Sequence, residues 1–390
     1  YVNNRGKAII AAVIGTAPIT EGVRLCAAHI DSPRLDMKQN PLYEDHELAM
    51  FKTHYYGGIK KYQWTTIPLS LHGVIVKADG TSVEVNIGED AGDPVFCVTD
   101  LLPHLAPQQM KRPATEIVRG EELNLLVGSM PFNKDEESEQ VKLNILNILH
   151  EKYGITETDF LSAELEAVPA FPARELGFDR SMIGGYGHDD RVCAYTSLVA
   201  MLEVENTEYT TCCLLVDKEE IGSVGATGMH SRFFENMVAE VMDRCGQYSE
   251  LKLRRTLTNS CMLSSDVNSA FDPNYANVNE KKNTAYFGKG VVFMKYTGSR
   301  GKSGSNDASA EYIGKLRKIM DDNNVSFQTA ELGRVDLGGG GTIAYILANY
   351  GMNVIDSGVG VQNMHAPYEV ISKVDLYEAY KSYKAFLKDA

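Results

Sequence analysis

Apolar runs of strand length alternate with amphipathic stretches along the second half of the chain. In chain order, these helix-like and strand-like stretches are residues 191–206, 210–217, 232–246, 260–266, 308–323, 325–331, 341–351 and 353–359. Helical periodicity marks the longer stretches, whereas the shorter ones are continuously apolar. Strands that alternate with helices predict a mostly parallel central sheet flanked by helices, which is an α/β fold.

Residues 68–174 carry a different pattern. Residues 70–90 alternate between polar and apolar positions around an Asp-Gly pair, which predicts a β-hairpin. An acidic loop at 134–140 precedes a stretch, 141–154, that has helical periodicity and ends at a glycine. The remaining segments are rich in proline, and we expect a β-rich fold for this region.

The chain is therefore expected to contain two domains. An inserted β-rich domain, residues 68–174, would interrupt an α/β domain formed by residues 1–67 and 175–390. Residues typical of helix ends support the helices expected in residues 175–390. Asn306 or Asp307 would cap the helix at 308–323. A last helix would begin at Ser372, with a capping-box partner three residues later.

Composition and charge narrow the classes of function. Of 390 residues, 38 are basic and 52 acidic, which gives a net charge of -14 and argues against a surface that follows nucleic-acid phosphates. No apolar stretch has membrane-spanning length. The seven cysteines are odd in number and form no C-x-x-C pair, so we expect reduced core cysteines and a cytoplasmic protein. Because a strand-like run follows almost directly on Tyr1, we also expect that a native upstream segment is missing.

Residues that can bind metals follow the ends of the apolar strands. They are His29, Asp31, Asp189, Asp190, Glu219, Glu220, Asp266 and His365. Each alone has an ordinary structural explanation, since an aspartate before a helix is an N-cap and a strand-end histidine is usually hydrogen-bonded. Together they occupy the ends of several strands, and the carboxyl ends are where ligands bind in open α/β sheets.

Clustered buried carboxylates need a cation, because otherwise they take up protons. Mixed sets of histidine, aspartate and glutamate suit zinc, and a pair of metal ions activates water and polarises a carbonyl. Asp31 lies two residues from His29, on the same side of a strand, where it can fix the histidine tautomer. Glu219 and Glu220 are adjacent and can point in different directions, so that one binds metal while the other moves a proton.

Other kinds of site fit the sequence less well. Residues 298–303, GSRGKS, end like a phosphate-binding loop, but Tyr296 stands where the first glycine should be. Residues 336–344, DLGGGGTIA, lack the spacing of a dinucleotide site, and we expect them to let the backbone approach a substrate or the wall of the metal site. Cys193 lies among apolar neighbours, which favours core packing over nucleophilic catalysis.

Several segments carry a resemblance to a known family. They are HIDSPRLD (29–36), LLPHLAP (101–107), GHDDRVCAYTSL (187–198), DKEEIGSVGATGM (217–229), SSDVNSAFDPNY (264–275) and MHAPYEVIS (364–372). With these segments, the chain resembles the aspartyl aminopeptidase and vacuolar aminopeptidase I family of dinuclear zinc exopeptidases. The match extends through most of the chain, and the first and fourth segments together are highly specific.

The resemblance implies two divalent metal ions per subunit, most simply zinc, with cobalt or manganese as alternatives. The implied ligands are Asp189 as the bridge, His29 and Asp266 in one site, and Glu220 and His365 in the other. Asp31 would orient His29, and Glu219 would be the general base. Asp190 would follow the bridging residue through a strained peptide that aims both side chains, and His188 is expected to be a neighbour and not a third ligand.

The resemblance also implies an assembly. The inserted domain would mediate dimerisation, and His104 would reach the active site of a neighbouring subunit. Dimers would assemble into a tetrahedral dodecamer that admits only short peptides. A preference for acidic N-terminal residues would need a cation in the first substrate pocket, and Lys295 is the candidate.

These observations predict a metal-dependent aminopeptidase that removes N-terminal residues from short peptides, with a preference for acidic residues if Lys295 faces the first substrate pocket. A related co-catalytic zinc deacylase or carboxypeptidase would share the metal ligands and differ in the pocket for the free amine or carboxylate. A catalytically inactive shell or cargo protein is the alternative outside enzymes, but such a protein would be expected to have lost Glu219 or a ligand.

Overall fold

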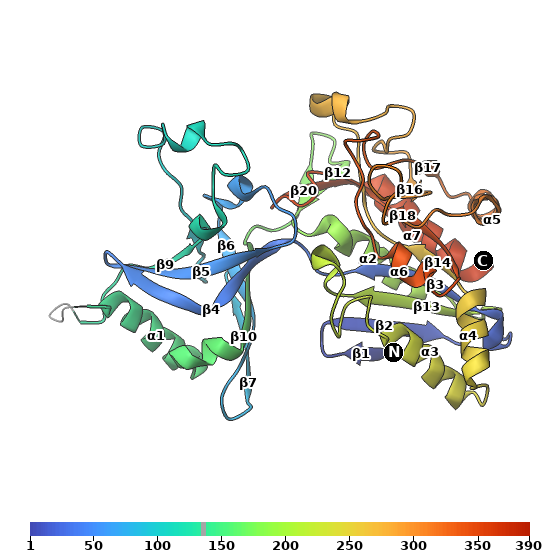
Figure 1. The fold of residues 1–390 in the computed structure, drawn as a ribbon, viewed down its shortest axis with the longest axis horizontal. Coiled ribbons are helices and arrows are strands. Elements are labelled where there is room, and N and C mark those ends of the chain that lie inside the picture. Colours follow the sequence, from blue (N-terminus) through green and yellow to red (C-terminus); the bar gives the residue numbers. More distant parts are fainter. Residues whose placement is uncertain (134–137) are drawn as a thin grey trace. The chain divides into compact units, whose positions relative to one another are not determined.

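The chain folds into two units, which are shown in Figure 1. The computed structural model describes residues 1–133 and 138–390. The first unit comprises residues 1–32, 174–364 and 368–390, and the second comprises residues 33–173 and 365–367. Residues 134–137 of the expected acidic loop lie outside the described residues.

A mixed sheet, eight-stranded in the described residues, forms the centre of the first unit. In spatial order its strands are β1 (Val2–Asn4), β2 (Ala8–Val13), β13 (Thr210–Val216), β3 (Val23–His29), β14 (Cys261–Ser264), β18 (Asn353–Gly358), β16 (Val291–Met294) and β17 (Phe327–Thr329). The central strands β13, β3, β14 and β18 are parallel to their neighbours within this set. Strands β2 and β16 flank this set antiparallel to it.

Helices cover both faces of this sheet, and the predicted α/β class is confirmed. Every residue of β3 and of β13 is buried, which explains why their sequences are mostly apolar. Successive side chains face opposite sides, so Leu25 and Cys26 belong to different apolar clusters. The helices that pack on the Cys26 side are α2 (His188–Leu202), α5 (Ala310–Asp322) and α7 (Lys373–Asp389). Those on the Leu25 side are α3 (Phe233–Arg244), α4 (Glu250–Asn259) and α6 (Ala344–Ala348).

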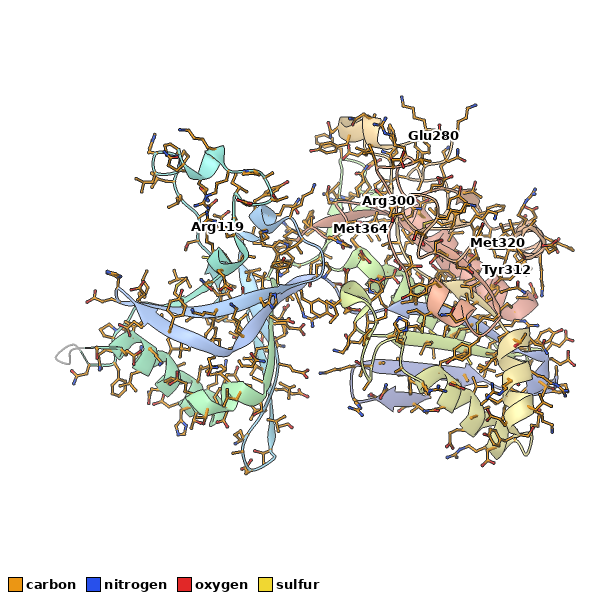
Figure 2. The ribbon with its side chains drawn as sticks, viewed as in Figure 1. Arg119, Glu280, Arg300, Tyr312, Met320 and Met364 are labelled. Atoms are coloured by element: carbon orange, nitrogen blue, oxygen red, sulfur yellow. The ribbon has the colours of Figure 1, made fainter. Side chains whose placement is uncertain are left out.

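Helix α5 shows how this packing is specified. Tyr312 and Met320, which are labelled in Figure 2, both belong to the cluster on the Cys26 side. The Tyr312 hydroxyl donates a hydrogen bond to the Met262 carbonyl oxygen at 3.0 Å, which satisfies the one polar group that this side chain brings into the core.

A smaller sheet belongs to the same unit. Its strands, as far as the chain is described, are β11 (Arg174–Leu176), β12 (Met182–Gly185), β20 (Glu369–Ser372), β19 (Gly360–Gln362) and β15 (Asn268–Ser269). Short 3-10 helices occupy Ile19–Glu21, Glu219–Ile221 and Pro273–Val278. None of the helices in the described residues is long and apolar enough to cross a lipid bilayer.

The second unit is an antiparallel sheet with one α-helix among its described residues. The strands are, in order, β7 (Ser82–Ile87), β6 (Leu69–Val76), β10 (Ala163–Pro169), β4 (Arg34–Asp45), β5 (Leu48–Tyr56), β9 (Leu125–Gly128) and β8 (Cys97–Val98). Strands β6 and β7 form the hairpin predicted at the Asp-Gly pair. Strands β4 and β5, although they precede residue 68, pair within this same sheet.

Helical segments complete the second unit. The helix α1 (Gln140–Tyr153) ends at Gly154, which adopts the left-handed conformation with φ of 65°. This glycine stop was predicted, because a residue without a side chain adopts that conformation at low cost. The 3-10 helices are Lys61–Trp64, Gln109–Lys111, Gly120–Glu122 and Glu157–Ser162.

Two predicted helix caps differ from the structure. Ser309 caps α5 by accepting a hydrogen bond from the Tyr312 amide, because Asp307 is held by Lys295 and Lys302 instead. Helix α7 begins after Ser372 as predicted, but Asp375 does not complete a capping box. Its carboxylate instead accepts hydrogen bonds from other amides of the first unit.

Asp375 is fully buried and ties the start of α7 to a neighbouring loop. Its carboxylate accepts hydrogen bonds from the amides of Gly288 at 2.9 Å and Gly290 at 2.7 Å. We expect Asp375→Ala to lower the free energy of unfolding by about 2–4 kcal/mol, because the buried Gly290 amide and the Gly288 amide both lose a charged acceptor. Differential scanning calorimetry of the purified protein would measure the change as a lower Tm.

The matched control is Asp322→Ala, which removes an exposed carboxylate that pairs with Lys318. We expect this control to change stability by less than about 0.5 kcal/mol, because exposed ion pairs contribute little. Equal Tm values for the two variants would contradict the role assigned to Asp375.

Candidate metal centre

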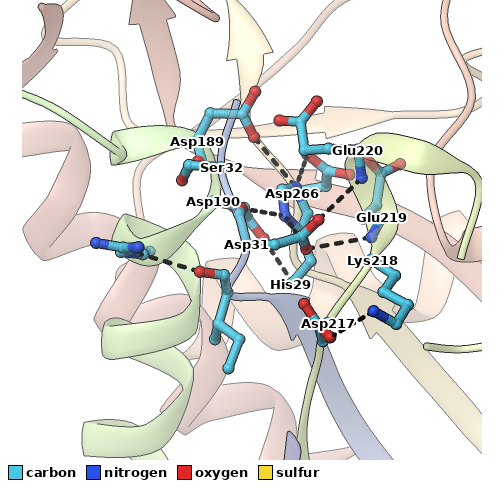
Figure 3. Close-up of polar contacts among 12 residues, drawn as sticks. His29, Asp31, Ser32, Asp189, Asp190, Asp217, Lys218, Glu219, Glu220 and Asp266 are labelled. Atoms are coloured by element: carbon cyan, nitrogen blue, oxygen red, sulfur yellow. Dashed lines mark hydrogen bonds and ion pairs between the residues drawn. The ribbon is translucent and has the colours of Figure 1, made fainter. Parts of the chain in front are cut away.

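Six of the predicted site residues meet beyond the carboxyl ends of central strands of the eight-stranded sheet (Figure 3). They are His29 and Asp31 at the end of β3, Glu219 and Glu220 after β13, Asp266 after β14, and Asp189 at the start of α2. Strand β3 lies between β13 and β14 and is parallel to both. The three strands therefore deliver their following residues to the same place, as expected for an open α/β sheet.

His29 lies at the centre of this group and is almost fully buried. Its Nε2 atom is 3.1 Å from Asp189 Oδ1 and 3.9 Å from Asp266 Oδ1. On the other side of the ring, Nδ1 is 3.0 Å from the Asp31 carbonyl oxygen and 3.4 Å from Asp31 Oδ1. A proton on Nδ1 lets the ring donate to Asp31, and this tautomer leaves Nε2 as a metal-ligand atom.

Asp31 also holds the loop that carries the two glutamates. Its Oδ1 and Oδ2 atoms accept hydrogen bonds from the amides of Glu219, at 3.1 Å, and Glu220, at 3.2 Å. These residues form a single 3-10 turn that follows Lys218, whose φ is 70°. The sequence analysis gave Asp31 only the role of orienting His29. Its second contact joins segments far apart along the chain, and no sequence signal indicates it.

The main chain of Asp189 is held from two sides. Ser32 Oγ donates to its carbonyl oxygen at 2.7 Å, and Glu369 Oε2 accepts from its amide at 3.1 Å. The peptide bond between Asp189 and Asp190 is cis. Ser32 and Glu369 are functional neighbours that the sequence analysis missed, although Ser32 directly follows the motif residue Asp31.

The buried charges of this group perturb one another. Burial raises the pKa of Asp266 well above its usual value, and the neighbouring carboxylates Asp190, Glu219 and Asp189 raise it further. Burial also raises the pKa of Asp190. For His29, burial alone would lower the pKa, but the contacts with Asp189 and Asp31 hold it well above the usual value. The group therefore favours added positive charge, as a bound proton or as a cation.

The arrangement of ligand atoms fits a divalent cation. Two overlapping groups can hold an ion: His29, Asp189 and Glu220 form one, and His29, Asp190 and Asp266 form the other. Within each group the ligand atoms lie within 4.8 Å of one another. One imidazole nitrogen with several carboxylate oxygens is a donor set that suits zinc. The residues present therefore fit the metal chemistry predicted from the sequence.

Asp190 is not among the ligands that the resemblance implies. The structure places it in the second group, and its Oδ2 accepts a hydrogen bond from the His29 amide at 3.3 Å. Two consecutive aspartates before a helix were the available signal, because one N-cap would have sufficed. The ring of His188 is partly buried, and burial lowers its pKa.

The two candidate ligand groups do not include the predicted residues His365, His104 and Lys295. His365 and His104 belong to the second unit, where Nδ1 of His365 is 2.7 Å from the Gly58 carbonyl oxygen and His104 is exposed. Lys295 lies in the first unit and pairs with Asp307. Cys193 is fully buried, and burial raises the pKa of its thiol, in agreement with the predicted core position.

Comparison with known proteins identifies the family to which this site belongs. Residues 1–387 match the model of the family described as aminopeptidase I zinc metalloprotease (M18). The probable M18 family aminopeptidase 1 of Clostridium acetobutylicum is 63% identical over 389 residues, which cover 100% of this chain and 84% of the relative. The corresponding protein of Thermotoga maritima is 49% identical, over 100% of this chain and 85% of its own length.

Solved structures agree with these relatives. A crystal structure of an M18 family aminopeptidase from Thermotoga maritima matches with a TM-score of 0.96 and 48% identity, covering 99% of this chain and 85% of that chain. Aminopeptidase I from Clostridium acetobutylicum matches with a TM-score of 0.94 and 61% identity, over 99% of this chain and 84% of that chain. The family expected from the sequence motifs is thus confirmed, and the chain belongs to the M18 family of aminopeptidase I zinc metalloproteases.

Proposed function

We propose that this protein is a zinc-dependent aminopeptidase that removes single residues from the N-termini of short peptides by a two-metal mechanism. The observation that carries the proposal is the pair of overlapping ligand groups around His29, beside the loop of Glu219 and Glu220. Membership of the M18 family supports the metal dependence and the aminopeptidase class.

The proposed ligands follow the family pattern. Asp189 would lie between two zinc sites, with His29 and Asp266 in one, and Glu220 and His365 in the other. Cobalt or manganese could replace zinc, since both accept nitrogen and oxygen ligands. When bound, the metal ions supply Lewis-acid chemistry, which polarises the scissile carbonyl and makes water more acidic.

Glu219 is the proposed general base. Its carboxylate accepts a proton from the attacking water and returns that proton to the nitrogen of the leaving amine. Asp31 supports this role because it holds the Glu219 amide, and with it the turn on which the carboxylate is carried. Asp31 also orients the ring of His29, so one side chain positions both a ligand and the base.

The second unit is proposed to mediate assembly. In this proposal residues 68–174 mediate dimerisation, and His104 reaches the active site of a neighbouring subunit. The dimers then assemble into a tetrahedral dodecamer. Leu101, Leu102 and Leu105 support this proposal because they are more than half exposed around His104. A related fold with 18% identity and a TM-score of 0.77, from a Saccharomyces aminopeptidase, is described as a dodecamer.

Substrate preference and location are proposed on separate grounds. Lys295 is the proposed partner of an acidic N-terminal residue, although such a residue would have to compete with Asp307 for it.

A cytoplasmic location is proposed because all seven cysteines are free, and every one lies in the described part of the chain.

Replacement of Glu219 by glutamine tests the proposed base. We expect Glu219→Gln to lower kcat by about 10²–10⁴-fold, because the amide cannot accept the proton. The zinc content, measured by inductively coupled plasma mass spectrometry, should stay unchanged. The control Glu240→Gln removes an exposed carboxylate from α3 and should retain full activity. A Glu219→Gln enzyme with wild-type turnover would rule out the assignment.

Metal removal tests the cofactor. Dialysis against a chelator should abolish hydrolysis of leucyl-p-nitroanilide, and added zinc, cobalt or manganese should restore it. The Tm of the metal-free protein should also fall, because bound ions stabilise only the folded state. Unchanged activity after the metal content has fallen below one ion per ten subunits would contradict the proposal.

Peptides with blocked and free N-termini separate the proposed activity from its alternatives. An aminopeptidase should hydrolyse a free peptide and leave its N-acetylated form intact, because the free amine is part of the recognised group. Hydrolysis of the N-acetylated peptide would favour a related deacylase or carboxypeptidase instead. Absence of all hydrolysis by zinc-loaded protein would favour an inactive shell or cargo protein.

A further inference from the structure

Two glycine-rich segments of the first unit surround one cavity. Residues 296–302 and 331–339 together contribute the lining of a cavity of about 240 Å³. Neither segment has the spacing of a phosphate-binding loop, and the metal centre does not include them. Residues 303–330 separate them in sequence, so the cavity exists only because the fold brings them together.

The backbone fixes the contact between the two segments. The Gly340 amide donates a hydrogen bond to the Thr297 carbonyl oxygen at 3.0 Å. A Cβ atom on Gly339 would lie 2.6 Å from the Gly298 carbonyl oxygen, which is shorter than any acceptable contact. Glycine at this position is therefore required by the close approach of the two chains, and the wall of the cavity is built from main chain.

Charged side chains line the cavity unequally. Three cations, Arg300, Lys302 and Arg334, face two acids, Glu331 and Asp336. Arg300 is labelled in Figure 2. The three cations and two acids leave one excess positive charge on the lining.

Some of the charged side chains that line the cavity already contact other side chains of the protein. Lys302 Nζ lies 3.0 Å from Asp307 Oδ2 and 3.9 Å from the centre of the Tyr296 ring. Glu331 accepts a hydrogen bond from the Tyr296 hydroxyl at 2.7 Å. The guanidinium groups of Arg300 and Arg334, by contrast, contact no acceptor in the part of the chain that the structure describes. Two guanidinium groups are therefore available to a ligand.

A series of short contacts connects the wall of the cavity to the metal centre. Gly339 in its wall is three residues from Thr342, a distance of at most about 11 Å along the chain. The Thr342 hydroxyl donates to Asp356, which also accepts from Ser264 Oγ at 2.8 Å. Ser264 ends β14, two residues before Asp266, and Asp356 lies close enough to Glu219 for their charges to interact.

We propose that this cavity binds a carboxylate of the peptide substrate, carried beyond its N-terminal residue, with Arg300 and Arg334 as the cationic partners. The carboxylate is that of an acidic side chain or of the peptide C-terminus. The proposal rests on the proposed aminopeptidase function and adds a second point of recognition to it. Guanidinium groups suit this role because they bind carboxylates through paired hydrogen bonds.

Size and charge favour this ligand over other anions. A cavity of about 240 Å³ is smaller than the ordinary 300–1,000 Å³ range of pockets for drug-sized ligands, which favours a small ligand group such as a carboxylate. The two uncommitted guanidinium groups suit one carboxylate, because each of its two oxygens can accept a hydrogen bond. The two lining acids would repel the second negative charge of phosphate.

Steady-state kinetics with matched peptides test the proposal. The peptide Leu-Gly-Glu-amide should have a kcat/KM about tenfold higher than Leu-Gly-Gln-amide, chiefly through a lower KM. Leu-Gly-Gln with a free C-terminus distinguishes a terminal carboxylate from a side-chain carboxylate, and an advantage for either peptide supports the proposal. Leucyl-p-nitroanilide, which carries no carboxylate, measures the activity of the metal centre alone.

Substitutions at the two arginines assign the effect to the cavity. Arg300→Gln and Arg334→Gln should each remove most of the tenfold advantage and leave turnover of leucyl-p-nitroanilide unchanged. The control Arg255→Gln removes an exposed guanidinium on α4 and should keep the full advantage. Equal loss of activity on every substrate would indicate a structural role and overturn the proposal.

Further outcomes separate this proposal from the function on which it rests. Wild-type hydrolysis of all peptides at equal kcat/KM would overturn the carboxylate site and leave the aminopeptidase function intact. A gain confined to Asp-Gly-Gln-amide would place the anion at the first residue and also overturn it. Sensitivity of leucyl-p-nitroanilide turnover to inorganic phosphate, lost in the arginine variants, would assign the cavity to a free anion instead. Failure of the zinc-loaded wild type on every substrate would overturn both proposals.

Discussion

The carboxylate of Asp31 joins two segments of the first unit that lie 188 residues apart in sequence. In its own segment it faces the ring of His29, the last residue of β3. From the other segment it accepts hydrogen bonds from the amides of Glu219 and Glu220. Both segments follow strands of one parallel pair, so the sheet brings the groups within reach and Asp31 sets their final positions. The other features of the metal centre depend on this contact, because it fixes the positions of a candidate ligand histidine and both glutamates relative to one another.

The metal centre concentrates negative charge where the sheet excludes water. Burial raises the pKa values of Asp190 and Asp266, and His29 is the one imidazole in the two described ligand groups. Such a cluster lowers its free energy by taking up protons or by binding cations. The main-chain contacts from Ser32 and Glu369 keep Asp189 in place in either case, so the ligands do not have to be assembled anew around each ion. This preorganisation reduces the ordering that metal binding requires.

Local patterns in the sequence were sufficient for the α/β class, the hairpin at the Asp-Gly pair, the glycine stop of α1 and the strand-end positions of His29 and Asp266. Each of these features depends on neighbouring residues. Features that depend on distant contacts could not be predicted. The cap at Ser309 required knowing that two lysines occupy Asp307, and the second role of Asp31 required knowing which loop approaches it. The cavity between two glycine-rich segments is of the same kind, since each segment alone lacks a recognisable spacing.

Strand β3 fixes the position of His29 more firmly than the 3-10 turn fixes Glu219 and Glu220. It is hydrogen-bonded to neighbours on both sides and buried on both faces, so its amides are protected from solvent exchange until the whole unit opens. His29 is its last residue. Glu219 and Glu220 lie on a single helical turn that is only partly buried, and such turns open at low free energy. The metal centre thus combines a histidine fixed by the central strand with two glutamates whose turn is held in place by the side chain of Asp31.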